Sequence, residues 1–549
     1  MHYNMQSVTN NQIIKTNVCI IGSGPAGMTL ANEFSDGKQS VVVLESGDDK
    51  ASRYGDDLNK GFLSGMLNQA THEVRARQVG GTANHWIVKM AGNNANGFRF
   101  VPLQPLDFAT WPLSREEIDP YYERLHHLLN LGPFAYDNLA IWKGNTQGAT
   151  LTNQSINSGI FSFCGTDYFT KTFPAKLQNS PTHHLYRNAT VSELITSTDG
   201  SNVLAAKVLA PNGNTMTVEA DQFILAASGF GVPQILLNSK SQCHPDGLGN
   251  NNDVVGRYYI DHSLIFHGYF KISPNMHEKL KFYDMRDING VSVIGSIGLP
   301  EALKKQENLQ NLEAMLFPKP NEKNYNAFKS VQEFAWAIKQ TKPMEHSLWR
   351  NTVNLVKGLP YLIHIAYQKY FNGMVLMPGL ATGGWSKLSP KELDKRYQII
   401  ELMGLAEQRP KKTNRVTLSN TRDALGMPRI AVHMDWDETD TQSIIKTEKK
   451  LVEGLQAQGF GEFHSYHEHN GNKLNYYSHT CHHLMGTARM GNDPTTSVVD
   501  SNCKIHGVNN CYIASSAVFP SGGYANPTMT MLALCLRLAD HLKSSFTQS

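Results

Sequence analysis

The sequence predicts an α/β protein whose parallel sheet begins near the N-terminus and whose remaining residues form a second domain. The first observation is Val18–Ile21, a short uncharged apolar run typical of a buried parallel strand. A glycine-rich turn and a helical pattern over Met28–Phe34 follow it directly. The second is the run Phe223–Ala227, which returns the chain to a parallel sheet. The third is the length of 549 residues, which is too great for one such domain.

The turn has the spacing Gly-x-Gly-x-x-Gly between a strand and a helix. Gly22 permits a tight turn, Gly24 lets the backbone approach a pyrophosphate, and Gly27 lets helix and strand pack closely. The next strand, Val41–Leu44, ends at an acid suited to a ribose hydroxyl. The pattern predicts dinucleotide binding, with an ordinary strand–helix turn as the alternative, and its residues are Gly22, Ser23, Gly24, Pro25, Ala26, Gly27 and Glu45.

Charge and cysteine usage narrow the class of protein. The net charge of +3 comes without a long basic run, which argues against nucleic acid as a partner. The seven cysteines are odd in number and never spaced C-x-x-C, which indicates reduced thiols and a cytoplasmic location. Residues 1–12 carry no apolar signal-peptide core. The apolar stretch Gly358–Tyr367 is too short to span a bilayer, so we expect no transmembrane segment.

Further elements follow in chain order. Ser114 and Glu117 form a capping-box pattern at the start of a helix that continues through Leu128. Residues 185–228 alternate strand patterns with turns, and Pro211–Asn214 predicts a hairpin. The later segments are a β meander over 396–436, a helix over 438–458 capped by Asp437 or Thr439, a strand over Cys511–Ala514 that we expect beside Val18–Ile21, and a helix over Thr528–Leu542.

Residues 300–375 contain apolar side chains at helical spacing, among them Leu348, Trp349, Val356, Ile363 and Tyr367. Two interpretations are open. These helices either face the core of the second domain, or form a lid or a surface that docks on a membrane or a partner.

Two C-terminal stretches contain candidate catalytic side chains. The first runs from His479 to Met490 and includes a His-His pair before Gly486-Thr487. The second, Gly522–Thr528, opens the terminal helix with Asn-Pro-Thr. A metal interpretation of the first stretch would use His479, Cys481, His482 and His483, but no second ligand cluster has matching spacing, so we expect no metal.

With these motifs in view, the chain resembles the glucose–methanol–choline oxidoreductases, two-domain flavoenzymes that bind FAD and oxidise alcohols. Within that family it most resembles pyranose oxidase and bacterial sugar or glycoside oxidases, because its second active-site position is Asn. The resemblance covers most of the chain except about 150–180 and 265–390. It rests on the glycine turn with Glu45, on Gly80-Gly81-Thr82, on Val255-Gly256-Arg257 through Asp261-His262, on His483–Thr487, on Asp500, Gly507 and Val518-Phe519-Pro520, and on Asn526-Pro527-Thr528.

The resemblance implies a catalytic pair. His483, three residues before Gly486-Thr487, would accept the substrate hydroxyl proton while hydride leaves carbon for flavin N5. Asn526 would lie beside the substrate oxygen, although Asn before Pro also suits helix capping. The helix that begins after Pro527 and Thr528 would direct its positive end toward the flavin.

The resemblance also implies a loop that packs on the flavin ring. Its residues are Gly80, Gly81, Thr82, Asn84, His85 and Trp86. Pyranose oxidase carries its covalent flavin linkage on a histidine in a similar loop, so His85 either forms that bond or contacts a dissociable flavin. Many family members have Asp before Val-Phe-Pro, where this chain has Ser515 and Ser516, which can hydrogen-bond the cofactor.

The resemblance implies an FAD-binding domain of the Rossmann type, discontinuous over 1–110, 185–262 and 475–549. A connecting or lid region would span 111–184, and a substrate domain on a mostly antiparallel sheet with flanking helices would span 263–474. The expected activity is oxidation of a sugar or sugar-bearing alcohol, with oxygen or another oxidant as acceptor and the oligomeric state open. The alternatives are a flavin-containing lyase of the same fold, a dehydrogenase of a non-sugar alcohol, and an interaction protein that retains the flavin fold.

Overall fold

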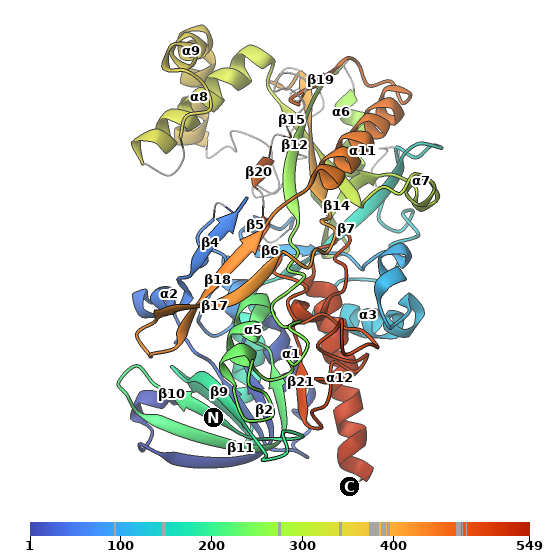
Figure 1. Cartoon of the computed structure of the whole chain (residues 1–549). Helices are drawn as coiled ribbons and strands as arrows, with labels where there is room; N and C mark the ends of the chain where they lie inside the picture. The colour runs from blue at the N-terminus through green and yellow to red at the C-terminus, as the bar shows by residue number, and fades with distance from the viewer. Residues whose placement is uncertain are drawn as a thin grey trace.

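The computed structural model describes residues 1–67, 69–92, 95–144, 150–272, 276–339, 343–372, 384, 385, 391, 393, 396–467, 474, 476–478 and 480–548. It confirms a mixed α/β architecture, with one mainly parallel sheet at one end of the molecule and one antiparallel sheet at the other (Figure 1).

The first sheet has the strand order β1-β8-β3-β2-β11-β10-β9, with β21 also paired to β11. Pairing is parallel from β1 through β11 and antiparallel across β9, β10 and β11, so the expected hairpin is present. The last strand, β21, pairs with β11 and not with β2, where we expected it. The strands are β1 (His2–Asn4), β2 (Gln12–Ile21), β3 (Val41–Leu44), β8 (His183–Arg187), β9 (Thr190–Thr196), β10 (Val203–Leu209), β11 (Thr215–Leu225) and β21 (Cys511–Ile513).

Helices pack on this sheet and bring the two ends of the chain together. Helix α12 packs against both α1 and α3, as the red and blue ribbons of Figure 1 show. Helix α3 carries the expected capping box between Ser114 and Glu117. The helices are α1 (Pro25–Glu33), α2 (Arg53–Asn59), α3 (Arg115–Leu129), α4 (Phe173–Asn179), α5 (Ser228–Asn238) and α12 (Thr528–Gln548).

The second sheet is antiparallel, in the order β19-β12-β16-β15-β14-β7-β6-β5, with β13 on β14 and β20 on β12. Helix α11 (Glu438–Gln456) is capped by Asp437, one of the two expected caps. Short helices α6 (Met276–Lys279) and α7 (Glu301–Gln306) belong to the same part of the chain. The strands are β5 (Val88–Lys89), β6 (Asn96–Phe100), β7 (Asn157–Gly165), β12 (Ser263–Lys271), β13 (Arg286–Ile288), β14 (Val291–Gly298), β15 (Leu312–Lys319), β16 (Ile399–Ala406), β19 (Phe463–Ser465) and β20 (Tyr476–Ser478).

The expected β meander over 396–436 is wrong in its pairing. Strand β16 lies inside the second sheet between β12 and β15, and all eight of its residues are buried. Strands β17 (Arg415–Arg422) and β18 (Pro428–Met434) form a separate small sheet with β4 (Phe62–Gly65). The cause is that β16 pairs with β12 and β15, which lie far from it in the sequence, whereas β17 and β18 pair with each other across a short turn.

Sheet pairing divides the chain differently from the expected domain limits. Strands β5, β6 and β7 lie within 1–110 and 111–184, yet they extend the second sheet. The domain limits remain a proposal.

Helices α8 (Glu322–Ile338) and α9 (Leu348–Asn372) pack on each other and project from the second sheet (Figure 1). Several of the apolar side chains that we considered as core are exposed on α9. In the part of the chain that the structure describes, no helix is long and apolar enough to cross a membrane.

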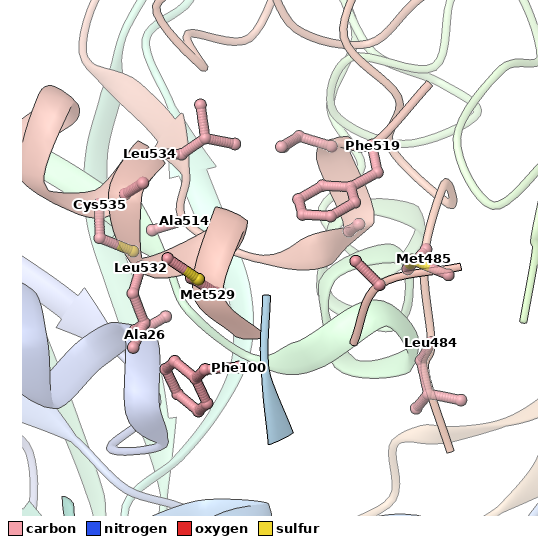
Figure 2. Close-up of a cluster of buried hydrophobic side chains, with 14 of the residues drawn as sticks. Ala26, Phe100, Leu484, Met485, Ala514, Phe519, Met529, Leu532, Leu534 and Cys535 are labelled. Atoms are coloured by element: carbon pink, nitrogen blue, oxygen red, sulfur yellow. The ribbon is translucent and has the colours of Figure 1, made fainter. Parts of the chain in front are cut away.

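A buried apolar cluster joins the two ends of the chain beneath the glycine-rich turn. Figure 2 shows Ala26 of α1, Phe100 of β6, and Met529, Leu532 and Cys535 of α12 within it. Leu484 and Met485 lie in the same view, so the segment with the His-His pair is attached to this core.

Candidate active site

A cavity of about 410 Å³ extends from the turn after β2 to the start of α12. Segments far apart in the sequence line it. They are the glycine turn, the end of β3, the loop before β5, the 481–484 segment and the C-terminal module, by which we mean residues 511–548. The cofactor residues we expected that line it are Gly22, Ser23, Gly24, Pro25, Ala26, Glu45, Gly81, Thr82, His85, Trp86, Ser515, Ser516, Pro527 and Thr528.

Each of the three motif glycines lacks a side chain for a different physical reason. Gly22 has a φ of +110°, and a Cβ there would lie 2.5 Å from the Ala226 carbonyl oxygen. A Cβ on Gly27 would lie 1.9 Å from the Gly22 carbonyl oxygen, so Gly27 serves packing and does not line the cavity. A Cβ on Gly24 would meet no atom nearer than 3.9 Å, so the backbone at Gly24 is open to the cavity.

Glu45 is buried at the edge of the cavity. Its carboxylate accepts hydrogen bonds from the Ser23 hydroxyl at 2.6 Å and from the backbone N–H of Ser23 and Gly47 at 3.0 and 2.8 Å. Burial raises the pKa of Glu45, and these hydrogen bonds act in the opposite direction. The carboxylate thus also fixes the turn that precedes α1.

The loop before β5 is held by its own hydrogen bonds. Asn84 donates from Nδ2 to the carbonyls of Val79 and Gly81 at 3.0 and 2.8 Å, so Asn84 shapes the loop without lining the cavity. Gly80 also lies outside the lining, and its N–H donates to the Ser23 carbonyl. Trp86 stacks on Phe98, with ring centroids 5.7 Å apart. His85 lines the cavity, and burial lowers its pKa.

The two expected catalytic side chains are in contact. His483 Nε2 and Asn526 Nδ2 are 2.8 Å apart, and both residues are buried. Asn526 Oδ1 is buried with no hydrogen-bond partner in the described part of the chain, so its side chain makes no helix cap. The neighbouring His482 has a φ of +63° and contacts Gln69 instead, which separates the two histidines.

A second histidine determines which nitrogen of His483 carries the proton. His262 Nε2 lies 2.7 Å from the Gly523 carbonyl, which can only accept, so this nitrogen donates. A neutral His262 then accepts at Nδ1, which lies 2.7 Å from His483 Nδ1. His483 must therefore donate from Nδ1 and keep a lone pair on Nε2, the nitrogen next to Asn526.

The electrostatics keep this pair neutral. Burial is the main reason why the pKa of His483 lies well below its usual value, and the nearby His262 and Arg99 lower this pKa further. Burial likewise lowers the pKa of His262 to about 4, although the Gly523 carbonyl raises it. At neutral pH both imidazoles are therefore uncharged, and His483 can take up a proton.

Asp261 fixes the His483 segment to the start of β12. Its Oδ1 accepts from the backbone N–H groups of His262, Cys481 and His483 at 2.7, 3.0 and 3.0 Å. Burial raises the pKa of Asp261 to about 7, and these N–H groups oppose that shift. We gave Asp261 and His262 no role from sequence; the family motif Asp-His was the available signal.

The two serines support the segment from the other side. Ser516 donates to the Leu484 carbonyl at 2.8 Å, and Ser515 accepts from the Ala517 N–H at 3.2 Å. Both line the cavity.

A buried group of side chains in the antiparallel sheet region has potential metal-ligand atoms close together. Its members are His267, Glu448 and His467. Both imidazoles lie 2.7 Å from Glu448 Oε2, which is hydrogen-bond geometry. Burial opposes ionisation of Glu448, yet these contacts lower its pKa to about 2. His479, a member of the metal interpretation, lies outside the described residues.

A protein-family model described as GMC oxidoreductase matches residues 410–535. Paromamine 6'-oxidase from Streptomyces fradiae is 33% identical to this chain, over 95% of the chain and 90% of the relative. The chain belongs to the GMC oxidoreductase family. Another GMC-type relative, pyranose 2-oxidase from Tricholoma matsutake, is 21% identical over 85% of this chain and 73% of the relative. A solved pyridoxine 4-oxidase from Mesorbium loti shares the fold, with a TM-score of 0.53, 14% identity, and coverage of 96% of this chain and 99% of that chain.

GMC oxidoreductases bind FAD, and this protein is an FAD-dependent enzyme that oxidises a CH–OH group. The residues present fit that cofactor. The open backbone at Gly24 suits a pyrophosphate, and the cavity continues to His483 at its other end. Asn526, which we also expected to contact the cofactor, is fully buried beside His483 and does not line the cavity.

Proposed function

We propose that the protein oxidises an alcohol of a sugar or of a sugar-bearing small molecule, with His483 as the catalytic base. The observation that carries the proposal is the 2.8 Å contact between Nε2 of His483, a residue that lines the cofactor cavity, and the amide of Asn526, which is buried outside that lining. The sugar class is supported by the names of two relatives, paromamine 6'-oxidase and pyranose 2-oxidase.

FAD held in this cavity would supply the hydride acceptor. His483 Nε2 accepts the proton of the substrate hydroxyl, since its lone pair is held by the donation of Nδ1–H to His262. The substrate hydroxyl takes the place of the Asn526 N–H at Nε2, which frees the amide to donate to the substrate oxygen. The alcohol thus loses a hydride and a proton and becomes a carbonyl.

The electron acceptor is oxygen or another oxidant.

A cytoplasmic location is supported by the cysteines, because all seven are free in the structure. Cys19, Cys511 and Cys535 are buried in the first sheet and its helices.

An anaerobic screen of monosaccharides, glycosides and aminosugars tests the proposal. A substrate that donates hydride will bleach the flavin absorbance, and the product will be the corresponding carbonyl compound. A flavin-containing lyase would turn over a cyanohydrin without bleaching, and that result would overturn the proposal.

We propose further that His85 contacts the flavin without a covalent bond. The imidazole lines the cavity, but no hydrogen bond to it is found among the described residues, so nothing there fixes it for bond formation. Acid precipitation is therefore expected to release the yellow colour into the supernatant. Colour that stays in the pellet of the wild type and is lost with His85→Ala would establish the covalent link instead.

A further inference from the structure

The outer face of α9 is apolar, although nothing in the described structure covers it. Trp349, Val356 and Ile363 repeat every seven residues and are 77%, 70% and 62% exposed. Tyr367 and Tyr370 continue the same face, and Tyr370 is 83% exposed. Residues at this spacing share one side of a helix, so the exposed side chains form a continuous stripe.

Buried polar groups contribute to the contact between α8 and α9. Between α8 and α9, the fully buried Asn351 bonds to Ser330 and Glu333, each at 2.8 Å. Glu333 also accepts from His346 at 2.6 Å. The polar groups thus hold the two helices together and fix the rotation of α9, while its apolar side chains face outward.

Basic side chains line the margin of the stripe. Arg350 and Lys357 are exposed, and they repeat with His364 at seven-residue intervals. Residues 322–372 contain seven Lys or Arg and three Glu, a net charge of +4. The whole chain carries +3, so the positive charge of the protein is concentrated in this hairpin.

We propose that the α9 stripe docks on an anionic lipid bilayer, with α9 lying in the plane of the membrane surface. Such a surface supplies both an apolar layer for Trp349, Val356 and Ile363 and negative headgroups for Arg350 and Lys357. Tryptophan and tyrosine side chains favour the same interfacial depth. A second copy of the chain fits less well, because a self-complementary contact would place two positive hairpins against each other.

The test measures sedimentation of the FAD-loaded protein with two kinds of vesicle. One kind is pure phosphatidylcholine, and the other contains equal parts of phosphatidylcholine and phosphatidylglycerol. The variant Trp349→Ser/Ile363→Ser interrupts the stripe, and Arg350→Glu/Lys357→Glu reverses its charged margin. The matched control, Ile195→Ser/Leu204→Ser, replaces two exposed apolar side chains on β9 and β10.

The wild type and the control are expected to sediment with anionic vesicles and to be released by high salt. Each hairpin variant is expected to bind at least about ten-fold more weakly, with flavin spectrum, melting temperature and solution turnover unchanged. The proposal is overturned if the wild type ignores both vesicles, prefers neutral ones, or is unaffected by the stripe variant. It is overturned equally if ultracentrifugation without lipid shows self-association that the stripe variant abolishes.

Discussion

At the residue scale, the proposed chemistry depends on a chain of hydrogen bonds that ends at His483 Nε2. The Gly523 carbonyl orients His262, and His262 in turn makes Nδ1 the protonated nitrogen of His483. Asp261 holds the backbone of both histidines. The position of His483 could be predicted from its motif. Asp261 and His262 come from the segment just before β12, and His262 is 221 positions away from His483. The spacing of residues in the sequence does not reveal a contact between segments so far apart.

The lowered pKa of His483 predicts the pH dependence of flavin reduction. Protonation removes the Nε2 lone pair, so the rate falls as the pH falls, and the lowered pKa moves this fall below the ordinary imidazole value of about 6.5. The second-order rate constant for anaerobic flavin reduction is expected to stay level from neutral pH to below that value. A half-maximal rate at about pH 6.5 or above would show that His483 is not held neutral by burial.

At the element scale, the β2–α1–β3 unit is well specified by its own sequence. The limits of β3 match the expected strand, and α1 begins at Pro25 because the apolar pattern and the glycine turn agree locally. The misassigned β16 has an equally clear strand pattern. Its partners β12 and β15 come from distant parts of the chain, so local pattern could not identify its sheet.

Two glycine variants separate folding from cofactor binding. Gly27→Ala is expected to destabilise the protein by about 3 kcal/mol, because its Cβ would overlap the Gly22 carbonyl. Gly24→Ala is expected to leave the melting temperature of the FAD-free protein unchanged, since its Cβ lies in open space, and to weaken FAD binding at least about ten-fold. Melting curves and flavin titration measure both. Equal losses of stability in the two variants would contradict this assignment.

At the scale of the whole molecule, the cofactor site is assembled from the two ends of the chain. Residues 481–484, Ser515 and Thr528 line the same cavity as the glycine turn, and β21 completes the first sheet beside β11. This assembly could be predicted because family motifs occur near both ends of the chain. The exposed hairpin could not be predicted, because an apolar helix has the same pattern whether it faces a core or an external surface.

A fragment of residues 1–260 tests this assembly. It lacks β21, α12 and the His483 segment, so we expect it to aggregate or to bind no FAD, as measured by solubility and by bound flavin absorbance. A soluble fragment that retains FAD tightly would show that the C-terminal module is not needed for the cofactor site.

The most direct test of the proposed chemistry compares anaerobic flavin reduction in the wild type, His483→Ala and His482→Ala, with the best sugar from the screen. All three proteins are expected to retain FAD. The rate of reduction should fall by at least about 10²-fold in His483→Ala and remain near that of the wild type in His482→Ala, because His482 faces Gln69. Equal rates in the wild type and His483→Ala would show that another group takes the proton.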